Sequence, residues 1–339
     1  MRSLFITRFG GPGVLEVREV PTPSPKPGEV RVRVRAAGLN FSDVMARKGL
    51  YPDAPPPPCV MGYEAAGEID ALGEGVDGLE VGARVILLSR FGAQAEHVCV
   101  PAQQVLPMPE GASFEEAAAM PVVYLTAYHM LFRLAALRPK RKVLVHMAAG
   151  GVGVAAIQLC RTVADVEIFG TASASKHEFL RELGCDHPID YRNLDYAAEV
   201  LRLTGGKGVD LVLDPLGGRD WKKGLRLLRP AGHLIAFGFA NMSAGEKRSF
   251  LHMVRQALGV PLMTPLGLMD KNRTVSGVNV GHLWGEIEML TEELEDLLAL
   301  WRAGKIAPKV DAVVPFAEAA RAHGRLEKRQ NVGKVVLVP

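Results

Sequence analysis

Residues 143–153 read VLVHMAAGGVG and carry the clearest local pattern in the sequence. Its apolar start at 143–145 predicts a buried parallel strand. Small residues fill 148–153, and residues 154–164 have the apolar spacing of a helix. A strand, a small-residue turn and a helix in this order are typical of a dinucleotide-binding loop. In such a loop, backbone N–H groups and the positive end of the helix face a pyrophosphate.

The glycines of this loop follow the G-x-G-x-x-G pattern with one departure. Ala148 stands at the first place, and Gly150 and Gly153 fill the second and third. We therefore predict that Gly150, Gly151, Val152 and Gly153 bind a cofactor. The alternative is a tight strand–helix turn that binds no ligand.

The composition is that of a globular protein without a nucleic-acid-binding surface. The chain has 339 residues, of which 48% are hydrophobic and 23% are charged, enough for two domains. Its net charge of +3 comes from 40 basic and 37 acidic residues, so we expect no nucleic-acid partner. The N-terminal residues lack a signal-peptide pattern, and no apolar run approaches a membrane span, so we expect a cytoplasmic protein.

The first third of the chain predicts a β-rich domain. Val30, Val32 and Val34 alternate with arginines, which is typical of a half-buried antiparallel strand. Ser113 and Glu116 form a plausible capping box for a following helix. Further strands are expected at 65–72, 84–88 and 95–100.

The middle of the chain predicts a parallel, doubly wound sheet, because strands and helices alternate. A helix at 122–137 leads into the strand at 143–145. The later strands are expected at 166–170, 187–190, 209–213, 232–237 and 274–278, and the helices between them at 176–183, 195–203 and 220–228. We assign residues 124–281 to this domain and 1–123 to the β-rich domain. Residues 282–339, with an acidic helix at 283–304 and a strand at 334–338, complete the β-rich domain.

Residues 240–272 form a connection longer than its neighbours. The favoured interpretation is a helical lid or a subunit contact. Attachment to a membrane surface is the alternative, which the small number of cations disfavours.

The end of the second strand of this sheet indicates which nicotinamide cofactor is bound. NAD-binding sites place an acidic residue there, but residues 170–176, GTASASK, contain none. Thr171, Ser173, Ser175 and Lys176 are therefore predicted to bind the cofactor, and the last three favour the 2′-phosphate of NADPH. The alternative for Lys176 is a solvated lysine in the first helical turn.

Several longer runs carry a resemblance to a known family. The runs 37–43 (AGLNFSD), 62–67 (GYEAAG) and 331–339 (NVGKVVLVP), together with 148–153, resemble the medium-chain dehydrogenase/reductase superfamily over the whole chain. Within it, the chain is similar to the zinc-independent quinone oxidoreductases. Residues 146–153 and 169–178 resemble the vesicle amine transport protein homologues of that branch. The resemblance implies an α/β fold with a GroES-like β-rich domain and a Rossmann domain.

The residues of the metal sites in this superfamily are missing here. Zinc-binding members have Gly-His-Glu where this chain has Gly62-Tyr63-Glu64. The expected cysteine ligand near Asn40 is absent, as are the cysteines of the structural zinc lobe near 87–97. None of the four cysteines forms C-x-x-C. We therefore expect no metal.

The resemblance also implies roles for individual residues. Asn40 matches an asparagine beside the nicotinamide and is predicted to polarise a carbonyl, while Tyr51 is predicted to bond the substrate oxygen or the cofactor. A turn residue and a packed loop tyrosine are the alternatives. Some relatives have another tyrosine where this chain has Met45, which removes one proton donor. Six further residues match cofactor contacts: Thr126, Tyr191, Phe237, Gly238, Arg329 and Asn331. The alternatives are a plain helical threonine, a strand-end tyrosine, a core phenylalanine and a surface arginine.

These observations predict an NADPH-dependent, metal-free oxidoreductase that transfers hydride to a quinone or a conjugated enone. Its partner would be a small-molecule substrate. A homodimer formed near 274–280 is expected by resemblance alone. The alternative is an NADPH-binding protein associated with membranes or lipids that has weak or no catalysis.

Overall fold

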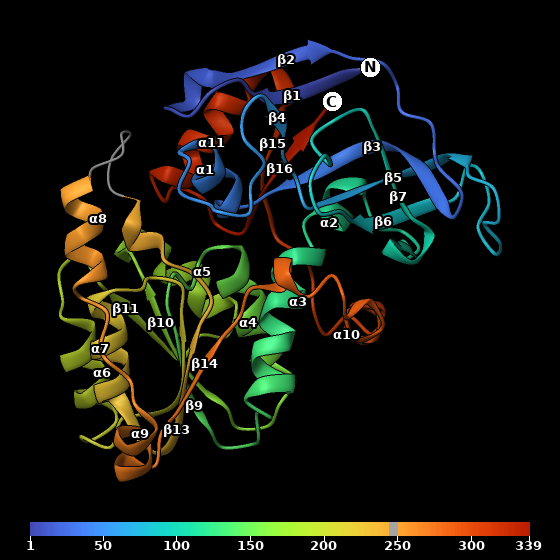
Figure 1. Ribbon diagram of the computed structural model, residues 1–339. Helices are drawn as coiled ribbons and strands as arrows, with labels where there is room; N and C mark the ends of the chain where they lie inside the picture. The colour runs from blue at the N-terminus through green and yellow to red at the C-terminus, as the bar shows by residue number, and fades with distance from the viewer. Residues whose placement is uncertain (244–249) are drawn as a thin grey trace. The chain divides into compact units, whose positions relative to one another are not determined.

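The computed structural model describes residues 1–243 and 250–339, and the described chain forms two units. Unit one consists of residues 1–125 and 281–339, and unit two of residues 126–280. Each unit has its own sheet and core, so each is described by itself (Figure 1).

Unit one is built around the long strand β3 (Glu29–Leu39). Val30, Val32 and Val34 are buried and the arginines between them face outward, which confirms the predicted alternation. The strand pairs antiparallel with three others, β5 (Glu64–Leu72), β7 (His97–Pro101) and β16 (Lys334–Val338). The sheet order is β15-β16-β3-β5-β6-β8, with β15 at Val310–Pro315, β6 at Arg84–Leu88 and β8 at Val105–Pro107.

Smaller elements complete unit one. A second sheet joins β1 (Arg2–Ile6) to β2 (Leu15–Glu19) and β4 (Cys59–Val60). The helices are α1 (Phe41–Arg47), α2 (Phe114–Ala118), α10 (Ile287–Arg302) and α11 (Ala319–Glu327). Ser113 and Glu116 form the predicted capping box of α2. Neither β15 nor α11 was predicted, because β15 is mostly half-buried and shows no clean alternation.

Unit two contains six parallel strands in the order β11-β10-β9-β12-β13-β14, which confirms the doubly wound sheet. The strands are β9 (Lys142–Val145), β10 (Glu167–Ala172), β11 (His187–Asp190), β12 (Val209–Asp214), β13 (Leu228–Ala236) and β14 (Thr274–Gly277). The helices α6 (Tyr196–Leu203) and α7 (Arg219–Leu227) cover one face of the sheet, and α4 (Gly151–Arg161) lies across the other (Figure 1). The short helix α5 (His177–Glu182) connects β10 to β11.

The core of unit two explains why the stretch at 143–153 is strongly determined. Leu144 packs with Phe169, Val212 and Leu234, and each of these side chains is fully buried. Burying an aliphatic or aromatic side chain of this size contributes about 1.5–3 kcal/mol. Because β9 lies in the middle of the sheet, its C-terminal end and the turn after it are held from both sides.

The helix predicted at 122–137 differs from the structure. The α-helix α3 (Pro121–Tyr128) passes into a π-helical segment, His129–Leu134. There the Ala135 N–H donates to the Met130 carbonyl at 3.0 Å, one residue further back than in an α-helix. The apolar period of the sequence does not distinguish these two hydrogen-bond patterns.

The insertion at 240–272 carries α8 (Phe250–Ala257) and α9 (Pro265–Lys271), while its residues 244–249 lie outside the described chain. Five of its large apolar side chains, Leu251, Leu258, Leu262, Leu266 and Met269, are 71–93% exposed. No helix in the part of the chain that is described has the length and apolarity needed to cross a bilayer.

Candidate cofactor site and active site

The turn after β9 presents backbone groups rather than side chains. Helix α4 begins after Gly150, and no side chain caps its first turn. Gly151, Val152 and Gly153 are its first residues, whose N–H groups have no carbonyl partner one turn earlier within the helix. Donors of this kind, at the positive end of an 11-residue helix, suit an anionic group such as a pyrophosphate.

Gly153 is required by the closeness of the turn to the helix. A Cβ atom at this position would lie 2.5 Å from the Ala148 carbonyl oxygen, closer than real Cβ contacts allow. The Ala148 N–H donates to the Thr171 carbonyl at 3.1 Å and holds the turn against β10. The arrangement therefore fits a dinucleotide phosphate, which needs the same close approach to the backbone.

Ser173, Ser175 and Lys176, which are predicted to bind the 2′-phosphate, follow β10, and Tyr191, predicted to flank the adenine or its 2′-phosphate, follows β11. The Ser173 and Ser175 hydroxyl oxygens lie 3.3 Å apart, and Lys176 and Tyr191 are half-buried. Because β10 and β11 are parallel neighbours, these residues reach the same edge of the sheet. Thr171 differs, because its side chain is buried in β10. Its hydroxyl lies 3.1 Å from His146 Nδ1 and accepts from the Met147 N–H, so it is engaged in ordering the glycine turn.

The other predicted contacts divide between the units. Thr126 is buried at the start of unit two, and Phe237 and Gly238 directly follow β13. Arg329 and Asn331 belong to unit one, where the Asn331 amide donates to the Gly333 carbonyl at 2.9 Å. Within unit two, the residues that follow the parallel strands β9, β10, β11 and β13 therefore reach the same edge of the sheet.

Sequence reasoning missed a polar group beneath the glycine turn. His146 directly follows β9, Asp214 ends the adjacent strand β12, and both side chains are almost fully buried. Burial lowers the pKa of His146 and raises the pKa of Asp214. The Asp214 carboxylate accepts from the N–H groups of Leu216 and Gly217 at 2.6 and 3.1 Å, which fixes the turn after β12. A charged residue directly after an apolar strand is the signal that could have identified this pair.

Asn40 occupies the equivalent junction in unit one, between β3 and α1. Its side chain is buried and both ends of its amide are bonded. Asn40 Nδ2 donates to Glu64 Oε1 at 2.8 Å, and Asn40 Oδ1 accepts from Lys334 Nζ at 2.6 Å. The amide has a second Nδ2 hydrogen, which no residue in the described chain accepts.

Glu64 and Lys334 form a buried ion pair that the sequence analysis did not single out. They begin β5 and β16, the two strands that flank β3 at this level. Glu64 Oε2 also accepts from the Val122 N–H at 2.6 Å. A Cβ at Gly38 would collide with the Glu64 carboxylate, so glycine is needed there. The signal in the sequence is a single charge at the head of an apolar run. We call Asn40, Glu64 and Lys334 the Asn40 clamp.

Asp43 lies behind the clamp and is fully buried. Its Oδ2 accepts from the Asn40 backbone N–H at 2.8 Å as part of the α1 capping box. Burial raises the pKa of Asp43 to about 7, and the nearby Glu64 carboxylate adds to the rise. The Asn40 N–H and the Lys334 ammonium act in the opposite direction but do not outweigh burial.

Tyr51 is half-buried in the loop after α1 and packs edge-on against Tyr63, with ring centroids 6.4 Å apart. Tyr63 in turn packs against Phe91, at 5.2 Å between centroids. Tyr63 stands where the zinc-binding enzymes have histidine, and burial raises the pKa of its hydroxyl. These three rings form an apolar wall with a polar edge at Tyr51.

A metal site does not assemble from the side chains that are described. Across residues 1–243 and 250–339, no three His, Cys, Asp or Glu side chains come together as a bound ion would require. Cys59, Cys160 and Cys185 are buried thiols, and Cys99 is partly exposed.

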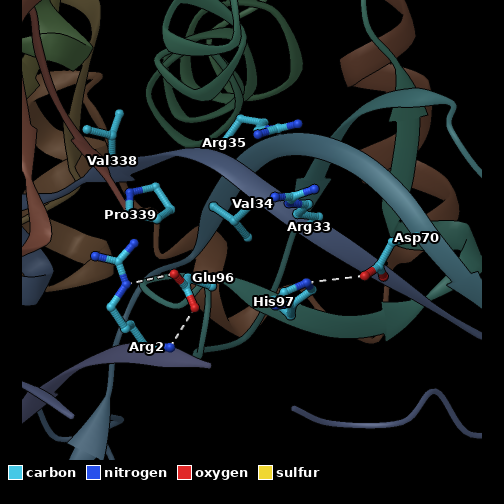
Figure 2. A pocket seen from close by; sticks show the side chains of 9 residues that line it. All are labelled: Arg2, Arg33, Val34, Arg35, Asp70, Glu96, His97, Val338 and Pro339. Carbon is cyan, nitrogen blue, oxygen red and sulfur yellow. Dashed lines mark hydrogen bonds and ion pairs between the residues drawn. The ribbon is translucent and has the colours of Figure 1, made fainter. Parts of the chain in front are cut away.

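A pocket of about 460 Å³ also lies in unit one, over the outward arginines of β3 (Figure 2). Most of its charges are paired with one another. Arg2 contacts Glu96 at 2.7 Å, and His97 contacts Asp70 at 3.2 Å. None of the predicted site residues lines it.

Comparison with known proteins agrees with this fold. The family model for the alcohol dehydrogenase GroES-like domain matches residues 26–110, and the model for zinc-binding dehydrogenase matches residues 183–337. A synaptic vesicle membrane protein VAT-1 homolog from Rattus norvegicus is 49% identical over 100% of this chain and 84% of its own length.

Two solved structures are similar over nearly their whole length. Quinone oxidoreductase from Escherichia coli, complexed with NADPH, has a TM-score of 0.88 at 30% identity and covers 100% of both chains. The CurK enoyl reductase has a TM-score of 0.84 at 31% identity and covers 99% of this chain and 98% of its own. The chain belongs to the medium-chain dehydrogenase/reductase superfamily of oxidoreductases, in the quinone oxidoreductase branch that includes the VAT-1 homologues.

Proposed function

We propose that this chain binds NADPH in unit two and transfers its hydride to a quinone or a conjugated enone without a metal ion. The observation that carries the proposal is the start of α4, which no side chain caps and where Gly153 packs on Ala148. The similar quinone oxidoreductase is complexed with NADPH, which supports the same cofactor here.

Different residues of unit two would bind different groups of the cofactor. The N–H groups of Gly151, Val152 and Gly153 would bind the pyrophosphate. Ser173, Ser175 and Lys176 would bind the 2′-phosphate, and no carboxylate stands at 170–176 to repel it. When bound, the cofactor supplies a hydride from its dihydronicotinamide.

Unit one would act on the acceptor. Asn40 donates its second Nδ2 hydrogen to the acceptor carbonyl oxygen, where negative charge develops as the hydride arrives. A proton from the Tyr51 hydroxyl or from water then completes the two-electron reduction to a hydroquinone or a saturated ketone. The rings of Tyr51, Tyr63 and Phe91 offer an apolar surface for a flat acceptor.

The test is NADPH titration followed by turnover assays with quinones and enones. We expect Asn40→Ala to lower kcat/KM by about 100-fold while leaving the NADPH dissociation constant unchanged. Tyr51→Phe should lower kcat by about 10-fold or less, because water can replace the hydroxyl as proton donor. A parent protein that binds NADPH but reduces no quinone and no enone would remove the catalytic part of the proposal.

A second candidate function is attachment to a lipid surface through the insertion at 250–271. Its five exposed apolar side chains favour this function, as do the vesicle membrane names of the similar proteins. Co-sedimentation with phosphatidylcholine and with phosphatidylserine vesicles tests it. Leu258→Ser with Leu262→Ser should abolish sedimentation, whereas Leu194→Ser, a half-exposed leucine elsewhere in unit two, should not. A parent protein that stays in the supernatant with both vesicle types contradicts this function.

A further inference from the structure

The ammonium group of Lys334 is held inside unit one by the Asn40 clamp. The lysine is 3% exposed, and its Nζ donates to Asn40 Oδ1 and to Glu64 Oε1. A buried charge of this kind is costly unless every contact is satisfied. Apolar side chains of similar volume are often at least as stabilising as a buried ion pair, so stability alone is a weak explanation of the clamp.

The clamp allows only one orientation of the Asn40 amide. Its oxygen faces the Lys334 ammonium, and its nitrogen faces the Glu64 carboxylate. A rotation by half a turn would place the amide N–H groups against the ammonium and the amide oxygen against the carboxylate. Both contacts would then be repulsive, so the second Nδ2 hydrogen is held in a fixed direction.

The ammonium also changes the donor strength of the amide. A cation at 2.6 Å from Oδ1 draws electron density toward the oxygen and leaves the Nδ2 hydrogens more positive. In the interior of the unit this effect is screened weakly. An N–H donor of this kind would stabilise a developing enolate or semi-reduced carbonyl oxygen more than the neutral substrate.

We propose that Lys334 is a positioning residue, which acts through Asn40 to orient and strengthen the hydrogen bond that the amide donates to the acceptor oxygen. This inference rests on the proposed function and deepens it. Glu64 has the complementary role of fixing the nitrogen end of the amide and neutralising the lysine.

Kinetics provide the first test. We expect Lys334→Met to lower kcat by about 10-fold to 100-fold with the NADPH dissociation constant changed less than about twofold. Lys334→Arg should recover part of this loss, because it restores the cation. Lys305→Met, which removes an exposed lysine of the same unit, is the matched control and should have parental kcat.

A double variant tests whether the loss in kcat of Lys334→Met comes only from destabilisation of unit one. Lys334→Met alone leaves the buried Glu64 carboxylate unpaired, which destabilises the unit. Lys334→Met with Glu64→Gln removes both charges and keeps an amide beside Asn40. We expect this pair to fold with near-parental stability and still to show the loss in kcat. Parental kcat in the double variant overturns the proposal, as does a loss that appears only in NADPH affinity, which would make Lys334 a cofactor ligand.

A spectroscopic readout separates this inference from the proposed function. The chain has six asparagines, so selective ¹⁵N labelling gives six pairs of side-chain amide signals, one pair for each NH2 group. The pair lost in Asn40→Ser identifies Asn40. In the parent, we expect an Asn40 side-chain amide proton with a downfield chemical shift and slow exchange with water. In Lys334→Met, its chemical shift and exchange rate should become those of an ordinary asparagine side chain. This experiment stands even if the parent reduces no acceptor. An Asn40 amide that is insensitive to Lys334→Met overturns the positioning role.

Discussion

A Cβ atom at Gly153 would lie 2.5 Å from the carbonyl oxygen of Ala148. The helix that begins the cofactor site therefore rests directly on the backbone of the turn. We predict that Gly153→Ala forces the two apart, which lowers the free energy of unfolding by about 1–3 kcal/mol. It should also weaken NADPH binding by at least about 10-fold, because the N–H groups move with the helix. Urea unfolding and NADPH titration measure these two effects.

Gly324→Ala is the matched control for this substitution. Gly324 lies within α11, and a Cβ there would meet no atom within 4 Å. Alanine favours a helix over glycine, so this variant should be as stable as the parent or more stable. If Gly153→Ala behaved like Gly324→Ala in both measurements, the close packing of α4 on the turn would not matter to the site.

Cofactor preference should depend on the charge at the end of β10. The parent is predicted to bind NADPH more tightly than NADH, because Ser173, Ser175 and Lys176 suit a 2′-phosphate. Lys176→Glu should narrow or reverse the difference. Lys207→Glu makes the same charge change at an exposed lysine of unit two and should leave the preference intact. Equal affinities of the parent for the two cofactors would remove the argument for the 2′-phosphate.

The buried Asp43 should make stability depend on pH. Its pKa of about 7 lies above the ordinary value of an aspartate, so at intermediate pH the folded state holds a proton that the unfolded state has lost. Its stabilising contribution is therefore complete in acid and is lost as the pH rises through neutrality. Asp43→Asn cannot ionise and should not show this loss.

Urea unfolding of both proteins at about pH 5 and about pH 8 measures the effect. The parent should lose on the order of a few kcal/mol relative to Asp43→Asn between these two values. A difference between the parent and the variant that does not change with pH would mean that Asp43 ionises in the ordinary range.

Activity should not depend on a divalent metal. One of the matching family models is that of zinc-binding dehydrogenases, yet Tyr63 stands at the histidine position and no metal-binding cluster assembles among residues 1–243 and 250–339. Elemental analysis of the purified protein should find less than stoichiometric zinc, and a chelator should leave the rate of NADPH oxidation unchanged. Zinc at one equivalent, removed together with the activity, would refute metal independence.

The sheet of unit two could be predicted from local patterns, because most of its strands contain a short apolar run bounded by a turn. The alternation at Val30–Val34 predicted β3 for the same reason, since burial on one face has a period of two. The π-helical segment after Tyr128 and the half-buried β15 could not be predicted, because neither leaves a distinct apolar period.

Some residues of the candidate site could likewise be predicted from local patterns, and others could not. The glycine turn and the residues at 173–176 are contiguous in the chain, so their pattern is visible in the sequence. The Asn40 clamp joins Asn40 to Lys334 across 294 positions, and only the pairing of β3 with β16 brings them together. In the sequence, Glu64 and Lys334 are each a single charged residue at the start of an apolar strand. Their ion pair forms only when the strands of the sheet pair.

Above all, we propose that the chain uses NADPH to reduce a conjugated carbonyl acceptor. The most direct measurement is a turnover assay with NADPH deuterated at the transferred position and an enone as acceptor, with the product examined by mass spectrometry and NMR. We expect consumption of the dihydronicotinamide and one deuterium on the β-carbon of the product. The proposal is wrong if NADPH is shown to be bound but stays intact, and if neither the enone nor any of a panel of quinones is reduced.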